Sequence, residues 1–293
     1  MEKVSVIIPS YNHSKYIEET IRSVFSQDYT NKEVIIIDDG SKDNSPTILK
    51  KMSEEFSFDL ILKENEGLCK TLNLGLERAS GELILIIASD DSLTPGRISE
   101  QVAFFTKDPE LAVVSGAINL IDNDGKYLFS KTSSKNGYIK FDDLISRNFI
   151  LAPTCMIRKS VYEKVGKYRE DYLYEDYYLW LKLLSKGYKI LVTSNVWANY
   201  RFMSGSMNSR LDLYYKGLKQ ILSDYLPNPK VESALYRARL IYFIKKAFYE
   251  DKPSFDQEEF KFLKKRDRLF VKLFTLIPSS ILKYIHQKVL ARV

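Results

Sequence analysis

The chain has 293 residues, of which 45% are hydrophobic and 28% charged, as in an ordinary globular protein. This length allows one large domain, or one domain with an appendage. The formal net charge is only +6, and no compact Lys/Arg block interleaved with aromatic residues occurs in the first two thirds, so we expect no nucleic-acid partner. No apolar run reaches the length of a membrane span, and no secretory signal opens the sequence. We therefore expect a cytoplasmic protein.

Short strands alternate with helices in the N-terminal part of the chain. Apolar runs rich in β-branched residues predict strands at Val4 to Ile8, Val34 to Ile37, Leu60 to Lys63 and Leu83 to Ala88. Helical spacing and helix-boundary residues predict helices at Lys15 to Gln27, Pro46 to Phe56 and Thr71 to Ala79. Because strand and helix alternate, we predict an α/β fold with a doubly wound, mixed but mostly parallel sheet.

The middle of the chain is more mixed, and its C-terminal part is helical. Strands are predicted at Ala112 to Leu120, Lys126 to Ser130, Thr154 to Arg158 and Lys189 to Thr193, and helices at Phe141 to Ser146 and Glu175 to Lys186. After about Arg201 strand signals stop, and helices are predicted at Leu211 to Leu226, Val231 to Tyr249, Asp256 to Leu276 and Ser279 to Val293. We predict an α/β domain of residues 1–205 and a helical region of residues 206–293.

Two acidic pairs follow predicted strands. Asp38 and Asp39 come directly after one strand, and Asp90 and Asp91 closely follow another. Ligands of open α/β sheets bind at the carboxyl ends of the strands. Paired carboxylates are tolerated best beside a cation, and Mg²⁺ or Mn²⁺ prefers carboxylate and phosphate oxygens. One pair would bind a metal and a diphosphate, and the other the base or ribose of a nucleotide. The alternative is that Asp simply favours turns after strands.

A third acidic site, Glu175 and Asp176, opens a predicted amphipathic helix. Asp176 is a candidate general base, because the helix dipole helps to keep it ionised, although the same dipole favours acidic residues there without any function. Trp180 lies four residues further and shares a face with Asp176, so its ring is a candidate platform for a sugar. The alternative for Trp180 is packing in the core.

These motifs together resemble family 2 glycosyltransferases of the GT-A fold. The likeness runs from Val4 to about Tyr200 and rests on six segments in family order and at family spacing. They contain Pro9, Tyr11 and Asn12; Asp38 and Asp39 with Gly40 and Ser41; Asn65 and Gly67; Ser80, Gly81 and Glu82; Asp90 and Asp91; and Glu175, Asp176 and Trp180.

The resemblance implies an inverting enzyme that uses a nucleotide-diphosphate sugar and Mn²⁺ or Mg²⁺. The residues it assigns to the donor site are Pro9, Tyr11, Asp38, Asp39, Asn65, Lys70 and Asp90. Within that site Asp39 would contact the base and Lys70 would lie near the diphosphate. Asp91, helped by Asp90, would bind the metal. Asp176 matches the catalytic base, and Glu175 and Trp180 would lie at the acceptor.

The chain departs from the family pattern at Ala88, Leu72 and Met203, where many relatives have an acidic residue, an arginine and a histidine. The resemblance also implies transfer of a single sugar, because the Gln-x-x-Arg-Trp signature of processive members is missing. The acceptor would be a glycan or a lipid-linked glycan, in bacterial surface polysaccharide assembly. The alternative is a degenerate member that binds a nucleotide sugar or acts as a scaffold. The two histidines, His13 and His286, are assigned no function.

Basic and apolar residues alternate in the C-terminal helices. The basic residues are Lys261, Lys264, Lys265, Arg266, Arg268, Lys272, Lys283, Lys288 and Arg292. A basic amphipathic helix can lie on an anionic membrane, which would suit a lipid-linked acceptor at the cytoplasmic face. The alternative is that these helices pack on the catalytic domain or on a second subunit in a homo-oligomer.

Overall fold

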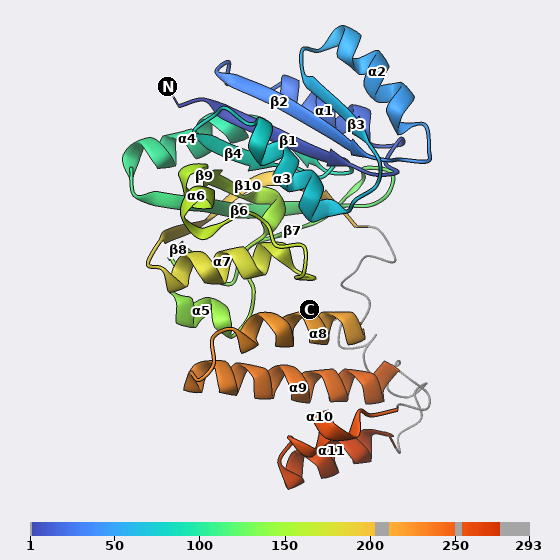
Figure 1. Cartoon of the computed structure of the whole chain (residues 1–293), viewed down its shortest axis with the longest axis vertical. Helices are drawn as coiled ribbons and strands as arrows, with labels where there is room; N and C mark the ends of the chain where they lie inside the picture. The colour runs from blue at the N-terminus through green and yellow to red at the C-terminus, as the bar shows by residue number, and fades with distance from the viewer. Residues whose placement is uncertain (1, 203–210, 250–253, 276–293) are drawn as a thin grey trace. The chain divides into compact units, whose positions relative to one another are not determined.

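The computed structural model describes residues 2–202, 211–249 and 254–275 (Figure 1). The chain forms two compact units, one of Met1–Asp171 with Glu175–Ser204 and one of Tyr172–Tyr174 with Gly205–Val293. Both the predicted helix Ser279 to Val293 and the position of Met203 lie outside the described residues.

The larger unit is built on one 10-stranded sheet. The strands are β1 (Val4–Ser10), β2 (Lys32–Asp39), β3 (Asp59–Lys63), β4 (Leu83–Ile86), β5 (Ser92–Leu93), β6 (Leu111–Ile121), β7 (Tyr127–Lys131), β8 (Gly137–Tyr138), β9 (Met156–Arg158) and β10 (Lys189–Arg201). Their order is β3-β2-β1-β4-β9-β6-β10-β5, with β7 beside β6 and β8 beside β10. The pairs among β1 to β4 and the pair β6 and β10 are parallel, while β9 runs antiparallel between β4 and β6. The predicted mixed, mostly parallel α/β sheet is confirmed.

Helices cover this sheet on both sides. Those of the larger unit are α1 (Ile17–Phe25), α2 (Ser45–Glu55), α3 (Leu68–Arg78), α4 (Arg97–Lys107), α5 (Phe141–Ile145), the 3-10 turn Ala152–Thr154, α6 (Ser160–Val165) and α7 (Glu175–Ser185). One apolar cluster joins α1, α2 and α4 to the same face of the sheet, with Ile21, Leu49 and Val102 as members. Helix α3 packs on the opposite face, because a Cβ added at Gly75 would lie 2.5 Å from the side chain of Ile7.

Several features differ from the predicted elements, among them the short strands β5 and β8, which were not predicted. Helices α4 and α6 were not predicted, β10 runs to Arg201 instead of ending at Thr193, and the predicted helix Asp256 to Leu276 is divided into two. Helix α7 was predicted to be amphipathic, yet seven of its side chains are buried, on most of its circumference. The physical reason is that α7 packs against α5, α6 and β10, and seven of its eleven residues are buried.

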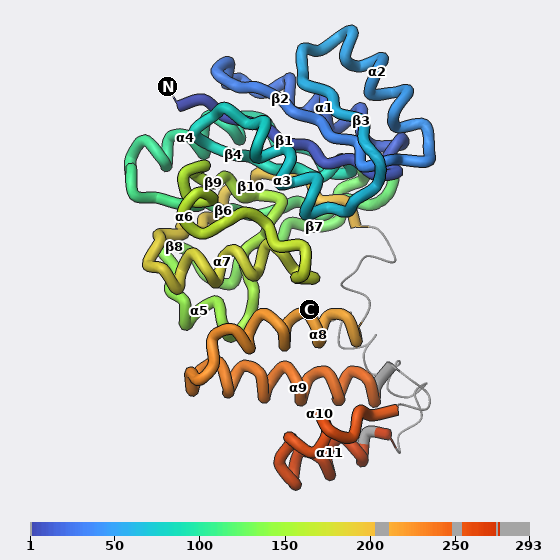
Figure 2. The backbone as a smooth tube through the Cα atoms, viewed as in Figure 1, coloured from blue at the N-terminus to red at the C-terminus, as the bar shows by residue number. Residues whose placement is uncertain are grey.

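The smaller unit is helical. It contains α8 (Leu211–Ser223), α9 (Pro229–Tyr249), α10 (Gln257–Lys261) and α11 (Lys265–Thr275), which lie in successive layers in Figures 1 and 2. Its core is aromatic: the rings of Tyr215 and Tyr242 stack with centroids 4.5 Å apart, and Phe243 is fully buried. Within the residues that the structure describes, no helix is long and apolar enough to cross a membrane.

Candidate active site

The loop after β1 links the two acidic pairs. Strand β1 lies between β2 and β4 in parallel register, so the residues after all three strands meet at one edge of the sheet. In this loop the main-chain N–H of Asn12 donates to the Ser41 hydroxyl over 2.8 Å. The His13 ring nitrogen Nδ1 lies 2.8 Å from the hydroxyl oxygen of Ser89. One loop therefore holds the segments that carry Asp38, Asp39, Asp90 and Asp91.

Asp39 is held in an ionised state at the end of β2. Its carboxylate accepts hydrogen bonds from the Lys63 ammonium and from the main-chain N–H groups of Glu66 and Gly67, the last two over 2.9 Å each. Burial opposes ionisation, but these donors outweigh it and lower the pKa of Asp39 below its ordinary value. Asp39 is therefore a fixed negative charge that could accept a further hydrogen bond from a ligand.

The other predicted donor-site residues differ in how accessible they are. Asp38 is 1% exposed, and its two carboxylate oxygens accept from the main chain and the hydroxyl of Ser41, so it stabilises the turn. The Asn65 side-chain amide donates to the main-chain oxygen of Asp39 over 2.9 Å. Tyr11 is 46% exposed, Lys70 is exposed near Glu66, and Pro9 is half-buried.

The second acidic pair contains a buried carboxylate oxygen without a partner. Asp91 is 2% exposed, and its Oδ1 accepts from the main-chain N–H of Arg201 over 2.9 Å. Among the described residues no group bonds to its Oδ2. Burial and the neighbouring Asp90 raise the pKa of Asp91 well above its ordinary value. Because a buried, unpaired carboxylate oxygen is costly, this geometry calls for a cation or a donor at Oδ2.

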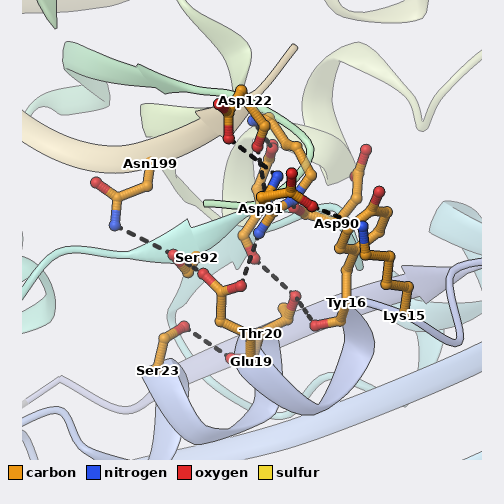
Figure 3. Close-up of polar contacts among 12 residues, drawn as sticks. Lys15, Tyr16, Glu19, Thr20, Ser23, Asp90, Asp91, Ser92, Asp122 and Asn199 are labelled. Carbon is orange, nitrogen blue, oxygen red and sulfur yellow. Dashed lines mark hydrogen bonds and ion pairs between the residues drawn. The ribbon is translucent and has the colours of Figure 1, made fainter. Parts of the chain in front are cut away.

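Arg201 organises the backbone around this pair, and Figure 3 labels its partners Asp90, Asp91, Asp122 and Glu19. Its guanidinium donates to the main-chain oxygens of Asp90 and Asp122 over 3.0 and 2.9 Å, and to the carboxylate of Glu19 over 2.7 Å. It also lies 4.3 Å from the centroid of the Tyr16 ring. Arg201 thereby ties α1, the loop after β4, the loop after β6 and the end of β10 together.

The third acidic site lies at the start of α7. Burial and the adjacent carboxylate of Asp176 raise the pKa of Glu175 to about 7. Burial also raises the pKa of Asp176, against the opposing effect of the Tyr177 main-chain N–H, which donates to its carboxylate over 2.7 Å. A carboxylate with a raised pKa is a stronger base than an exposed one, which is what proton abstraction near neutral pH needs.

Trp180 does not fit the predicted platform for a sugar ring. Its side chain is 1% exposed, so its face is covered by protein and offers no surface for stacking. The i, i+4 spacing places Trp180 over Asp176 on the helix, but α7 is buried on that face too. The alternative reading of Trp180, packing in the core, agrees with its burial, and we correct the acceptor-platform expectation for this residue.

A buried arginine links the second and third acidic sites. The Arg97 side chain is fully buried and donates to the main-chain oxygens of Pro153, Trp197 and Cys155. Burial lowers the pKa of Arg97, while the nearby Cys155 and Asp91 oppose that shift. Burial, and to a smaller extent the carboxylate of Asp176, raises the pKa of the Cys155 thiol. The charge of Asp91 therefore affects the Arg97 guanidinium, and the charge of Asp176 affects the Cys155 thiol. Arg97 and Cys155 are joined by a hydrogen bond to the Cys155 main-chain oxygen.

The residues present fit a divalent cation that is shared with a substrate. No group of three or more His, Cys, Asp or Glu side chains forms a metal site in the described part of the chain. Mg²⁺ is commonly bound through one or two carboxylates together with substrate phosphates. The free Oδ2 of Asp91 and the adjacent Asp90 supply such a donor set, and phosphate oxygens would complete it.

Sequence reasoning missed two residues of this site. His13 was assigned no function, yet its Nδ1 lies 3.7 Å from a carboxylate oxygen of Asp90. Arg201 was named only as the point after which strand signals stop. A signal for His13 was available, because it follows Tyr11 and Asn12 in the loop at the sheet edge. Nothing in the sequence places Arg201 against Asp91, since that contact spans 110 positions.

The fold and the site define an α/β protein with an acidic site at the carboxyl edge of its sheet. The profile of "Glycosyl transferase family 2" matches residues 5–166, so the chain belongs to that family. It is 31% identical over 204 residues to an uncharacterized glycosyltransferase of Rickettsia typhi, covering 66% of this chain and 64% of that protein. It is 31% identical over 214 residues to TuaG of Bacillus subtilis, a putative teichuronic acid biosynthesis glycosyltransferase, covering 70% and 81%.

Solved structures show the same fold. TarS of S. aureus, residues 1–349 in complex with UDP-GlcNAc, matches with a TM-score of 0.68 at 19% identity, covering 98% of this chain and 92% of that one. The mannosyltransferase PcManGT of Pyrobaculum calidifontis, in complex with GDP-Man and Mn²⁺, matches with a TM-score of 0.60 at 17% identity, covering 96% and 86%. These likenesses establish the GT-A-like architecture.

Proposed function

We propose that this protein is an inverting glycosyltransferase that transfers a single sugar from a nucleotide-diphosphate sugar to a hydroxyl of a glycan or lipid-linked glycan. The single observation that carries the proposal is the partnerless Oδ2 of the buried Asp91, beside Asp90 at the carboxyl edge of the sheet. Family membership and the names of relatives in surface-polymer synthesis support it. We infer a place in surface polysaccharide assembly from the same relatives.

The donor would lie across the loop after β1. Asp39 accepts a hydrogen bond from the base, and Tyr11 supplies an exposed ring beside it. Asp90 would bind the ribose, and Asp91 with Asp90 would hold Mn²⁺ or Mg²⁺, which when bound would neutralise negative charge on the diphosphate. Arg201 keeps the main chain of Asp90 and Asp91 in place.

The acceptor would be activated by Asp176. Its carboxylate takes the proton of the attacking hydroxyl, and the acceptor oxygen displaces the diphosphate from the opposite side of the anomeric carbon, with inversion. Glu175 is proposed to lie at the acceptor. Since its pKa is raised to about 7, Glu175 retains a proton below that pH and leaves a single negative charge at the helix start.

A membrane surface is proposed as a further partner of the smaller unit. Apolar side chains of its C-terminal helices are exposed: Phe262 at 65%, Leu269 at 61% and Leu273 at 52%. Lysines and arginines are interspersed among them. Exposed apolar groups flanked by basic ones match the chemistry of an anionic bilayer surface. A lipid-linked acceptor would be presented at such a surface.

The proposed function is tested by thermal denaturation with a panel of nucleotide-diphosphate sugars. UDP-GlcNAc is the first member, because it is the ligand of the TarS structure. We expect one donor with Mn²⁺ to raise the Tm of the wild type and to lose this effect with a chelator. Asp91→Asn should lose it as well, while Asp59→Asn, an exposed carboxylate paired with Arg78, should keep it. A panel without any Tm shift would contradict the proposal.

A further inference from the structure

A row of polar side chains crosses four strands beside the second acidic pair. Ser92 in β5, Asn199 in β10, Asn119 in β6 and Ser130 in β7 lie directly opposite one another in register, and we call these four residues the polar row. Their side chains bond in sequence, with Asn199 donating to Ser92 over 3.1 Å, Asn119 to Asn199 over 3.0 Å, and Ser130 to Asn119 over 2.8 Å. Figure 3 shows its first step, from Asn199 to Ser92. Ser92 follows Asp91 directly in the chain, and its hydroxyl donates to the carboxylate of Glu19 in α1 over 3.2 Å.

An exposed tyrosine closes the outer end of the polar row. Tyr127 pairs with Ile121, and Phe129 pairs with Leu120, so Leu128 is an extra residue in β7. This bulge brings Tyr127 to the same face as Ser130, because their partners Ile121 and Asn119 are two residues apart. The Tyr127 and Ser130 oxygens are 3.0 Å apart, and Tyr127 is 56% exposed.

In β6 the polar row lies on the face of the sheet opposite the apolar cluster under α1, α2 and α4. Ile118 belongs to the apolar cluster under α1, α2 and α4, so its neighbour Asn119 points to the opposite face. Ser115 shares that face with Asn119, four residues along β6. A hydrogen bond from Ser115 lowers the pKa of the Cys155 thiol, on which the carboxylate of Asp176 also acts. Asn119 therefore shares a face with Ser115, whose neighbour Cys155 is affected by the charge of Asp176.

The amides of the polar row retain hydrogen-bonding capacity. A carboxamide has two N–H donors and two acceptor lone pairs. Among the described residues, Asn119 and Asn199 each use one donor and one acceptor, and both side chains are half-buried. Cross-strand bracing explains the bonds within the row. It does not explain why the row ends on an exposed ring, whose face offers an apolar surface for the C–H side of a sugar.

We propose that the polar row and Tyr127 form the acceptor-binding surface. Asn119 and Asn199 bind hydroxyl groups of the acceptor glycan, and Tyr127 stacks on one of its sugar rings. This inference rests on the proposed function, since it requires that an acceptor glycan be present. It assigns acceptor choice to the β6, β7 and β10 edge of the sheet.

The test compares Tyr127→Ala and Asn119→Ala with Phe129→Ala as the matched control. Phe129 is 54% exposed on the same strand, but it pairs with Leu120 and points to the other face. The probes are the nucleotide sugar that stabilises the wild type and an array of immobilised bacterial surface oligosaccharides. Transfer to the array and hydrolysis of the donor by water are measured in parallel, and the Tm of each variant shows whether it is folded.

We expect Tyr127→Ala and Asn119→Ala to raise the acceptor KM about tenfold or more. A tenfold change corresponds to a loss of about 1.4 kcal/mol in the binding free energy of the acceptor. Their donor KM and donor hydrolysis should stay within about twofold of the wild type, and Phe129→Ala should change neither KM. An unchanged acceptor KM in folded Tyr127→Ala and Asn119→Ala overturns the inference. The inference is also overturned if the wild type hydrolyses the donor but transfers sugar to no glycan. If the wild type binds no donor at all, the proposed function itself is refuted.

Discussion

The main-chain N–H of Arg201 donates a 2.9 Å hydrogen bond to the carboxylate of Asp91, 110 positions earlier in the sequence. The Arg201 side chain then bonds to the main chain of Asp90, so one residue at the end of β10 holds both acidic residues. Since Arg201 is 3% exposed, its network is shielded from solvent and holds the loop firmly. The geometry of the second acidic pair thus depends on a residue from the far end of the unit.

Replacement of Arg201 should weaken donor binding and stability together. Arg201→Ala removes hydrogen bonds to Asp90, Asp122 and Glu19, and we expect a loss of about 2–4 kcal/mol in the free energy of unfolding. We expect kcat/KM to fall about 10- to 100-fold, because the acidic pair is no longer positioned. Urea denaturation and steady-state kinetics measure these two effects.

The control for Arg201 is an exposed arginine. Arg22→Ala breaks ion pairs with Glu18 and Glu55 at the surface, and we expect it to leave kcat/KM unchanged. Arg201→Lys keeps the charge but not the planar fork, so it should fold and still lose activity. Wild-type kcat/KM in Arg201→Lys would refute the positioning of the acidic pair by the guanidinium.

Asp176 should be required for transfer and not for donor binding. Asp176→Asn keeps the shape of the side chain but cannot accept the acceptor proton, so we expect kcat to fall at least about 10³-fold. The Tm shift caused by the donor and Mn²⁺ should remain. Release of nucleoside diphosphate in the presence of acceptor measures the first effect.

Asp28→Asn is the matched control for Asp176, because Asp28 is an exposed carboxylate that bonds to Ser99. It should leave both kcat and the Tm shift as in the wild type. Turnover at the wild-type rate by Asp176→Asn would remove this residue from the mechanism.

Stability should depend on pH through Glu175. Its pKa is raised from 4.5 to about 7 in the folded protein, so the folded state keeps a proton that the unfolded chain releases between these values. The contribution of Glu175 to stability therefore falls as pH rises through this window. Glu175→Gln has no proton to lose. Relative to wild type, it should gain on the order of 3 kcal/mol between pH 4 and pH 8.

Denaturant unfolding of Glu175→Gln at several pH values checks this. The exposed Glu54→Gln in α2 is the control, and its difference from wild type should not vary with pH in this window. A pH-independent difference between Glu175→Gln and wild type would show that Glu175 is not buried beside a second carboxylate.

The smaller unit should bind anionic vesicles through its exposed apolar side chains. Leu269→Asp and Leu273→Asp place a charge among residues expected to enter the bilayer, so each should reduce co-sedimentation with phosphatidylserine vesicles at least about fivefold. Vesicles of phosphatidylcholine alone should bind the wild type more weakly, since the basic residues then lack an anionic surface.

Leu62→Asp is the control, because Leu62 is 42% exposed on β3 of the larger unit. It should sediment with vesicles as the wild type does. If Leu269→Asp also sediments like the wild type, the membrane proposal is refuted.

Local sequence patterns were sufficient for much of the fold. The buried runs that became β1 and β2, and the spacing of Ile17, Ile21 and Val24 in α1, are properties of neighbouring residues, so the sequence alone determined them. The same spacing, Ile98, Val102 and Phe105, was present in α4 and was overlooked. The acidic residues at the end of β2 and after β4 were also predictable, because parallel strands end at one edge.

Only the tertiary structure decided how these residues are used. It buried Trp180, because α7 is enclosed on most sides and helical spacing cannot show what covers a face. It also brought Arg201 to Asp91 and aligned Asn119 with Asn199, across strands distant in sequence. Such contacts follow from strand order and register, which depend on how the whole chain packs and not on any local pattern.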